Sequence, residues 1–399
     1  MPRSHVIRLT ISATCLLSGG CPDDRTLVEF EPYEGEAYPD RVSDIAYPSR
    51  AALVTDSLSD TITVLDLATG AKLDARPVGR NPVDIDGPHH VAIDAARGVG
   101  FVALSYPRTN AVGPHATHGS SALPGYVQKL DLRDLSVQGR VRVDPNPGDI
   151  VLSEDGTRLV VSHFDLQRAT KNPTDIDAAR ATLALIDAVA FSQPKLIDTC
   201  VAPHGMALSR PDGRTAYVAC YGEDRLAVVD LTQPDAPPTL IDVGPGVVGF
   251  GAPSYGPYVA MLSPDGTYVV VSNTVSKDVR FYDVAAGTFD LDRTITTIGA
   301  PYFPAFTSDD KLVIPTQQPD AIVIVDLTGV EPTETRTFSA AECVLPHEVM
   351  REGDNTFVVC EGDKKSNGTV LMLDAALEVV ASTVVGVYPD AIRRMGAAQ

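Results

Sequence analysis

Two stretches of the chain read Cys-Val-x-Pro-His, and they end at His204 and His347. The proline–histidine pattern occurs a third time at Pro88, which is followed by two histidines, His89 and His90. Neutral imidazole is the commonest metal ligand among side chains, and it suits zinc, copper, iron and nickel. Histidines that follow proline in the same way, but far apart in the chain, could converge on one metal ion. We therefore expect His89, His90, His204 and His347 to bind a transition metal, copper or zinc.

Other polar residues occupy comparable places. His115 and His118 are spaced His-x-x-His, and His163 ends an apolar run, so these three histidines are additional candidate ligands. Carboxylates and tyrosines also stand one or two residues after a proline, and we expect them to line a ligand pocket beside the histidines: Asp149, Tyr258, Tyr302, Glu348 and Asp390.

The elements that must position these residues repeat along the chain. Seven apolar runs end in aspartate, from TVLD at Asp66 to LMLD at Asp374. A second apolar run precedes most of them, often after an Asp-Gly turn signal, and a proline opens a further short run upstream. Runs of this length, rich in β-branched and aromatic residues and separated by turn chemistry, are typical of strands. Each repeat is therefore a unit of four antiparallel strands.

A four-stranded unit of about 45 to 60 residues is typical of a β-propeller blade. The sequence predicts an all-β fold, a seven-bladed propeller forming one domain over residues 42–399. The last proline-led strand, at Pro389, follows the seventh unit, so we expect it to close the ring as the first strand of blade one. Residues 42–46 are the alternative for that strand. In this register each of the seven histidines after residue 21 maps to one face, called the top, and together they predict a histidine-lined funnel there.

The chain has no tryptophan, which argues against a WD-repeat protein. The units SPDGTYVVVSNTVSKDVRFYDVAAGT and RPDGRTAYVACYGEDRLAVVDLTQ resemble the YVTN-type β-propeller family over roughly residues 43–395. That family includes surface proteins, lactonase-like enzymes and binding modules, so the resemblance implies an exported propeller and leaves the function open. The histidine arrangement is also similar to the catalytic copper site of nitrous oxide reductase, but this chain lacks the second copper domain of that enzyme.

The cysteines fit an exported protein. Cys200 and Cys343 precede the first strand of blades four and seven, and Cys220 and Cys360 end the second strand of the same blades. The start of one strand lies beside the end of its antiparallel neighbour, within the separation that a disulfide allows. We expect the disulfides Cys200–Cys220 and Cys343–Cys360. Thiolate ligation of a soft metal is the alternative.

The N-terminus is predicted to be a targeting segment. Residues 1–21 carry a basic start, a short apolar run and small residues before Cys21, which is typical of a signal peptide. The last part resembles a bacterial lipobox, with lipidation at Cys21, although Ser18 replaces the usual leucine. Residues 22–41 would be an acidic, proline-containing tether. The resemblance implies a lipoprotein facing the periplasm or cell surface; secretion without an anchor is the alternative.

Composition excludes several functions. A net charge of −20 argues against nucleic-acid binding, which needs a basic face. The chain lacks Cys-x-x-Cys-His for covalent haem, and it has no nucleotide-binding fingerprint in a strand-to-helix context. It also has no apolar run of 18 residues, so the membrane is reached only through the lipid anchor.

Three functions remain. The first is an envelope-anchored, monomeric binding module for a small ligand or an envelope protein. The second is a copper-dependent oxidoreductase. The third is a lactonase-like hydrolase in which Glu348 or Asp149 works with His204 or His347. Redox-active metal would favour the second function, and ester turnover without metal would favour the third, so whether the protein is an enzyme stays open.

Overall fold

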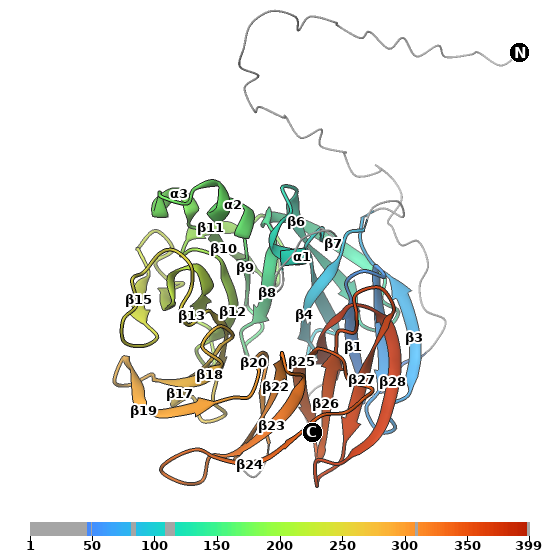
Figure 1. Cartoon of the computed structure of the whole chain (residues 1–399). Helices are drawn as coiled ribbons and strands as arrows, with labels where there is room; N and C mark the ends of the chain where they lie inside the picture. Colours follow the sequence, from blue (N-terminus) through green and yellow to red (C-terminus); the bar gives the residue numbers. More distant parts are fainter. Residues whose placement is uncertain (1–45, 49, 81–84, 108–115, 308–309, 397–399) are drawn as a thin grey trace, which may run out of the picture. The chain divides into compact units, whose positions relative to one another are not determined.

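The computed structural model describes residues 46–396, apart from residues 49, 81–84, 108–115 and 308–309. Seven antiparallel sheets are arranged around a common centre (Figure 1). Six of them have four strands, and the sheet of blade six has a fifth short strand because its innermost strand is interrupted. The predicted seven-bladed propeller is therefore confirmed.

The blades follow one another along the chain, and within each blade the strands run in order from the innermost to the outermost. The first four are blade 1, β29 (Pro389–Arg394), β1 (Ala51–Asp56), β2 (Thr61–Asp66) and β3 (Lys72–Pro77); blade 2, β4 (Pro88–Asp94), β5 (Val99–Leu104), β6 (Pro124–Asp131) and β7 (Val137–Pro145); blade 3, β8 (Pro147–Leu152), β9 (Arg158–His163), β10 (Thr182–Asp187) and β11 (Lys195–Asp198); and blade 4, β12 (Pro203–Leu208), β13 (Thr215–Cys220), β14 (Arg225–Asp230) and β15 (Thr239–Asp242). The other three are blade 5, β16 (Pro257–Leu262), β17 (Tyr268–Asn273), β18 (Asp278–Asp283) and β19 (Thr288–Thr296); blade 6, β20 (Ala300–Pro301), β21 (Ala305–Phe306), β22 (Lys311–Gln317), β23 (Ala321–Asp326) and β24 (Thr333–Phe338); and blade 7, β25 (Pro346–Glu352), β26 (Asn355–Cys360), β27 (Asn367–Leu373) and β28 (Val379–Val387).

The hydrophobic core lies between neighbouring blades. Phe101 of blade 2 and Val161 of blade 3 belong to one buried cluster, and Leu65 of blade 1 and Phe357 of blade 7 belong to another. Burial of these apolar side chains stabilises the ring by about 25 cal/mol per Å² removed from water. The outermost strands are more exposed, as β24 shows. A rigid stack of blades therefore surrounds the innermost strands.

The two ends of the described chain meet in blade 1. Strand β29 pairs antiparallel with β1, and Ile392 lies opposite Val54. The backbone amide of Gly386, in β28, also donates to Asp56 Oδ1 at the end of β1. The predicted closure by the C-terminal strand is confirmed. Residues 42–45 of the alternative strand lie outside the described residues.

The innermost strands share an irregular start. The pairing of β4 with β5 shifts between Pro88 and Val91, and similar shifts follow the leading proline in β8, β12, β16 and β25. Side chains of a regular strand alternate between its two faces, whereas a bulge re-aims them locally. Both residues after the proline, such as His89 and His90, can therefore reach the centre of the ring.

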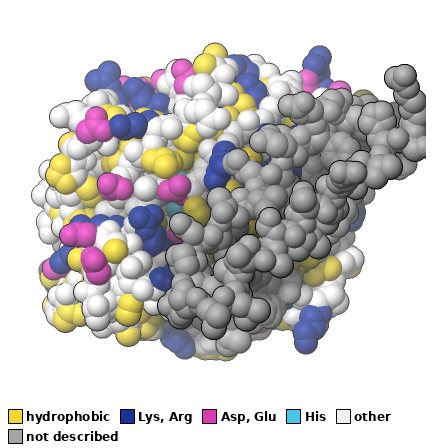
Figure 2. All heavy atoms as spheres, turned by 90° about the horizontal axis from the view of Figure 1, so that it is seen from above, with side chains coloured by type: hydrophobic (Ala, Val, Ile, Leu, Met, Phe, Trp, Pro, Cys, Tyr) yellow, Lys and Arg dark blue, Asp and Glu magenta, His cyan; other side chains and the backbone are white. Residues whose placement is uncertain are grey.

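Short helices occur in the connections on the side where the innermost strands begin. The longer insertions carry α1 (Ala116–Gly119), α2 (Leu166–Lys171) and α3 (Ile176–Ala179), and η1 (Tyr221–Glu223) follows β13. Phe164 and Ala179 of these connections pack in one cluster with Tyr258 and Tyr302. Acidic and basic side chains are interspersed over the coloured part of this face (Figure 2). In the described residues no helix is long and apolar enough to cross a membrane.

The two predicted disulfides are present. Cys200 and Cys220 are bonded with their Cα atoms 5.9 Å apart, and Cys343 and Cys360 with theirs 5.1 Å apart. Each bond ties the chain just before an innermost strand to the end of the second strand, as the repeat register predicts. The thiolate-ligand alternative is therefore wrong for this structure.

Candidate metal centre

The residue that follows the leading proline takes the same place in all seven blades. In blade order these residues are Asp390, His89, Gly148, His204, Tyr258, Tyr302 and His347. All seven residues are buried, and the three histidines and Asp390 have no exposed surface. Gly148 leaves room for a neighbour, because a Cβ there would lie 3.1 Å from His204 Cδ2. The repeat therefore builds a closed polar ring at the centre of the propeller.

His89 is held in one tautomer by the next blade. Its Nδ1 lies 3.1 Å from the carbonyl oxygen of Pro147, to which it donates a hydrogen bond. The Nε2 lone pair is then available, and Nε2 lies 3.1 Å from Asp390 Oδ2. Burial lowers the pKa of His89, but the negative charge of Asp390 and the Pro147 carbonyl outweigh it and leave this pKa raised.

His90 is oriented by Asp149. The distance from His90 Nδ1 to Asp149 Oδ1 is 3.1 Å, and both groups are buried. The carboxylate is fixed in turn by the backbone amides of Ile150 and Met206, which donate to Oδ1 and Oδ2. A carboxylate on one ring nitrogen is the arrangement that orients histidine ligands in metal sites. Nε2 of His90 has no hydrogen-bond partner among the described residues.

His204 is paired with a tyrosine. Its Nε2 lies 2.8 Å from the Tyr258 hydroxyl, and the two rings stack with their centroids 3.8 Å apart. Burial, and then the charge of the neighbouring histidines, keep the pKa of His204 well below its ordinary value. Burial also raises the pKa of Tyr258 well above its ordinary value. Both groups are therefore neutral, and donation from Nε2 to the tyrosine would leave Nδ1 as the ligand atom.

His118 enters the centre from α1. Its ring stacks on His89 with the centroids 3.9 Å apart, and its Nε2 lies 2.9 Å from Asp390 Oδ2. Its Nδ1 lies 3.3 Å from the Ser105 hydroxyl oxygen, and Ser105 donates to the Gly87 carbonyl. Burial and the charge of His89 lower the pKa of His118 to about 3. The insertion between β5 and β6 thus contributes a neutral imidazole.

Asp390 and His347 form the other side of the ring, with a residue that the proline pattern does not mark. His347 Nδ1 donates to the main-chain carbonyl of Asp390 at 2.9 Å, and its Nε2 lies 3.9 Å from Glu361 Oε1. Burial raises the pKa of Glu361. Burial opposes the charge of Asp390, but His89, His347 and His118 together hold its pKa well below the ordinary value. Glu361 follows the disulfide cysteine Cys360 and does not follow a proline, so the sequence analysis missed it.

Among the described residues, three overlapping groups have ligand atoms within 4.8 Å of one another. They are His89 with His90 and His204, His89 with His118 and Asp390, and His347 with Glu361 and Asp390. The structure therefore brings the four primary histidine candidates and His118 together. Imidazole with carboxylate is a donor set that suits borderline divalent ions such as zinc, copper or iron.

One described histidine candidate does not join these groups. His163, at the end of β9, is buried, but its Nδ1 bonds the carbonyl of Thr182 at 2.7 Å, and it belongs to none of the three groups. His115 lies outside the described residues. Tyr302 lies beside the ring, with its centroid 5.3 Å from that of His347.

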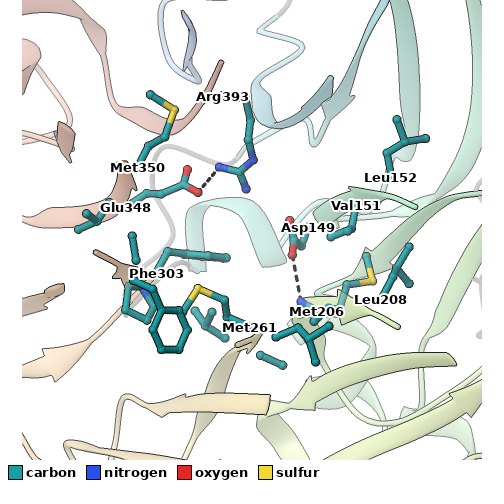
Figure 3. A pocket seen from close by; sticks show the side chains of 18 of the residues that line it. Asp149, Val151, Leu152, Met206, Leu208, Met261, Phe303, Glu348, Met350 and Arg393 are labelled. Carbon is teal, nitrogen blue, oxygen red and sulfur yellow. Dashed lines mark hydrogen bonds and ion pairs between the residues drawn. The ribbon is translucent and has the colours of Figure 1, made fainter. Parts of the chain in front are cut away.

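The predicted funnel on the top face is wrong. The histidines have no exposed surface, because the insertions that carry Phe164 and His118 pack at this end of the innermost strands. A cavity of about 430 Å³ lies instead along the later part of these strands, and Ser153 and Arg210 of the turns that follow them also line it. Asp149 and Glu348 line this pocket (Figure 3), whereas Tyr258, Tyr302 and Asp390 lie in the buried ring.

The pocket and the buried ring are adjacent, and two side chains contact both. Asp149 lines the pocket and also holds His90. Phe303 lines the pocket too, and its ring centroid lies 4.9 Å from that of His90 and 5.4 Å from that of His347. Methionine and leucine side chains form much of the wall, while Arg393 is ion-paired with Glu348 (Figure 3). A ligand in the pocket would therefore be separated from the histidines by a single layer of side chains.

No family model matches the chain, and no curated protein matches its sequence. Solved structures do share the fold. A periplasmic gluconolactonase from Pseudomonas aeruginosa aligns with a TM-score of 0.62 and 15% identity, over 86% of this chain and 98% of that one. Hydrazine synthase from Kuenenia stuttgartiensis aligns with a TM-score of 0.54 and 18% identity, over 78% and 90%. A dihydro-heme d1 dehydrogenase aligns with a TM-score of 0.54 and 16% identity, over 91% and 79%. The chain thus shares the β-propeller fold of these proteins, and its site must be judged from its own residues.

Proposed function

We propose that the protein is an exported β-propeller that binds a transition-metal ion through His89, His90 and His204 and presents it to a small ligand in the adjacent pocket. The convergence of three fully buried imidazoles on one point supports this proposal above all. Nε2 of His90 has no hydrogen-bond partner among the described residues, and a buried polar group that is not compensated costs about 1–3 kcal/mol. A cation at the point of convergence would remove this cost.

The environment of each histidine supports the proposal. His89 is fixed by a carbonyl, His90 by a carboxylate and His204 by a tyrosine. Outer contacts of this kind set the tautomer of a metal-binding histidine and hold its ring in place. A bound transition metal would supply a Lewis acid or a redox centre. These rings would hold the ion at one place in the ring, next to the Phe303 side chain that also lines the pocket.

We also propose that the protein is exported to an oxidising compartment. Two disulfides in a chain of this size favour an oxidising environment. The sequence of residues 1–21 favours export and lipidation at Cys21. Replacing Cys21 by serine should move the protein from the membrane fraction to the soluble fraction. Retention of the Cys21→Ser variant in the membrane fraction would contradict the lipid anchor.

Catalysis by hydrolysis is the second candidate. One structural neighbour is a gluconolactonase, and Asp149 and Glu348 line the pocket of this chain. Asp149 is committed to His90 and Glu348 to Arg393, so both carboxylates are already hydrogen-bonded. Lactone turnover by metal-free protein would favour this candidate. A redox-active ion with the Tyr258 hydroxyl beside its ligand His204 would instead favour the oxidoreductase.

Metal analysis tests the proposal directly. The mature protein, produced in an oxidising compartment, should retain copper, zinc or iron through gel filtration, as measured by mass spectrometry. A His90→Ala/His204→Ala variant should lose at least tenfold in affinity for its ion, whereas His163→Ala, which removes a buried histidine outside the three groups, should not. Wild-type protein that neither retains metal nor binds added Zn²⁺ would refute the proposed site.

A further inference from the structure

We infer that the pocket binds an uncharged, mostly apolar molecule with a carbonyl oxygen, such as an alkyl or aryl ketone, and that Arg393 donates hydrogen bonds to this oxygen. This inference rests on the proposed function, because it names the chemical class of the small ligand beside the buried ring. It depends on the residues of the pocket and not on which ion the histidines hold.

Arg393, on β29, has hydrogen-bond donors that the protein does not use. Its Nη1 donates to Glu348 Oε1 and, at 2.8 Å, to the main-chain carbonyl of Ile392. Among the described residues, no acceptor is bonded to its Nε or its Nη2. The side chain is 31% exposed and lines the pocket, where its guanidinium lies between Glu348 and Asp149 (Figure 3). These nitrogens are therefore open to a ligand.

The guanidinium stays positively charged in the pocket. Burial lowers the pKa of Arg393, but the negative charges of Glu348 and Asp149 outweigh it and leave this pKa raised. A charged donor makes a stronger hydrogen bond than a neutral one. An oxygen of the ligand would therefore gain more from Arg393 than from a hydroxyl or an amide.

The two carboxylates beside Arg393 offer little to a ligand. The side chain of Glu348 is 4% exposed, and its oxygens accept from Arg393 and from the amide of Ile392. The side chain of Asp149 is 3% exposed and is held against His90. In this part of the pocket, Arg393 is therefore the polar side chain that a ligand meets.

The charges of the pocket balance without a ligand. The described side chains that line it carry three positive and three negative charges: Arg210, Arg351 and Arg393, and Asp149, Glu154 and Glu348. Two pairs are in contact, Arg393 with Glu348 and, at 2.7 Å, Arg210 with Glu154. A charged ligand would add a charge that these groups do not offset, and a buried charge without a partner is unfavourable. A carbonyl oxygen accepts from the guanidinium and adds no net charge.

Apolar side chains form most of the rest of the pocket. Three of the six methionines in the chain line it: Met206 on β12, Met261 on β16 and Met350 on β25 (Figure 3). Because methionine is unbranched and flexible, such a wall adapts to apolar ligands of different shape. The cavity of about 430 Å³ lies within the range of about 300–1,000 Å³ for small-molecule sites. The pocket therefore fits a ligand whose body is apolar.

Fluorescence tests the chemical class. The probe is prodan, an aryl ketone whose emission shifts to shorter wavelength in apolar surroundings. We expect it to bind with this shift, both to protein stripped with a chelator and to protein loaded with Zn²⁺, and to be displaced by methyl hexyl ketone. Octanoate and octylammonium add a charge to a similar alkyl chain, so each should compete at least tenfold more weakly. Competition by either that equals competition by the ketone would overturn the charge argument.

Substitution tests the role of Arg393. Arg393→Met with Glu348→Gln removes the donor and its partner together, so no carboxylate is left unpaired, and prodan should bind at least tenfold more weakly. Arg293→Gln is the matched control, because Arg293 lines another cleft, with Tyr268 and Phe281. Prodan should bind this variant as it binds wild type. Undiminished binding to the double variant, or weaker binding to Arg293→Gln alone, would overturn the assignment of Arg393.

The outcomes separate the ligand from the metal. Failure of prodan to bind a protein that retains metal would overturn the ligand class while the metal site stands. Binding of prodan as expected to a protein that retains no metal would support the ligand class, although the metal half of the proposed function would fail. Circular dichroism would establish that each variant is folded, so that lost binding reports on the pocket.

Discussion

Ring closure buries a carboxyl group whose ionisation should be visible in the stability of the protein. Asp56 ends β1, has no exposed surface, and accepts hydrogen bonds from Thr61, Thr63 and the amide of Gly386 in the last blade. Burial raises the pKa of Asp56 from 3.8 to about 6, although these hydrogen bonds lower it. The folded protein therefore keeps this proton at pH values where the unfolded chain has lost it.

The sign and the size of the effect of pH on the free energy of unfolding follow from the linkage between proton binding and folding. A carboxyl with a raised pKa stabilises the fold fully below pH 3.8, and this contribution is lost as pH rises through about 6. The difference between the unfolded and folded pKa values of Asp56 corresponds to about 3 kcal/mol of stability, at 1.36 kcal/mol per pKa unit. Of this contribution, about 2.4 kcal/mol is lost between pH 4 and pH 7.5. Asparagine at position 56 cannot ionise. The free energy of unfolding of Asp56→Asn, minus that of wild type, should therefore rise by about 2.4 kcal/mol over this interval.

Urea denaturation of both proteins, at several pH values and with chelator present, measures this difference. Chelator removes any contribution of bound metal, and the other titrating groups cancel because they are common to both proteins. Asparagine also disturbs the hydrogen bonds to Thr61 and Thr63, but that effect is the same at every pH. A difference that stays constant from pH 4 to pH 7.5 would refute the argument that Asp56 is buried in its neutral form.

Three further predictions concern packing and cross-links. Cys343→Ser with Cys360→Ser opens a cross-link 17 residues apart, and the free energy of unfolding in urea should fall by about 3 kcal/mol, which an unchanged midpoint would contradict. Gly205→Ala places a Cβ 2.7 Å from Val259 Cα, so it should cost about 1–3 kcal/mol and lower the melting temperature, whereas a variant as stable as wild type would show that β12 and β16 are not so close. Phe303→Ala removes the ring between the pocket and the histidines, so a chelator should strip metal severalfold faster, and an unchanged rate would exclude this route.

Repetition made the fold predictable from the sequence. Apolar runs that end in aspartate recur in each blade, and their phase placed the strand at Pro389 in blade 1, where it pairs with β1. The same phase placed Cys200 beside Cys220. These inferences succeeded because backbone pairing in a repeat depends on the order of strands, which the sequence states directly.

The site was predictable only where it shares the repeat. His89, His204 and His347 follow the leading proline, and each belongs to at least one of the candidate ligand groups. His118 comes from an insertion, whose path no periodicity describes, and Glu361 follows the second strand of blade 7. The sequence also could not show that the insertions pack over the histidines and leave the pocket at the opposite end, because that depends on how irregular segments fold.

The position of Asp390 in the chain has a consequence for how the protein is made. Asp390, which belongs to two of the candidate ligand groups, lies on β29, which follows every other described strand in the chain. His89 and His118 of one of these groups belong to blade 2. A chain synthesised and translocated from its N-terminus would therefore present these histidines long before their carboxylate arrives. The centre could be completed only when β29 docks on β1, in the same compartment where the disulfides form. The metal available in that compartment after translocation, and not the metal of the cytoplasm, would then decide which ion the protein carries.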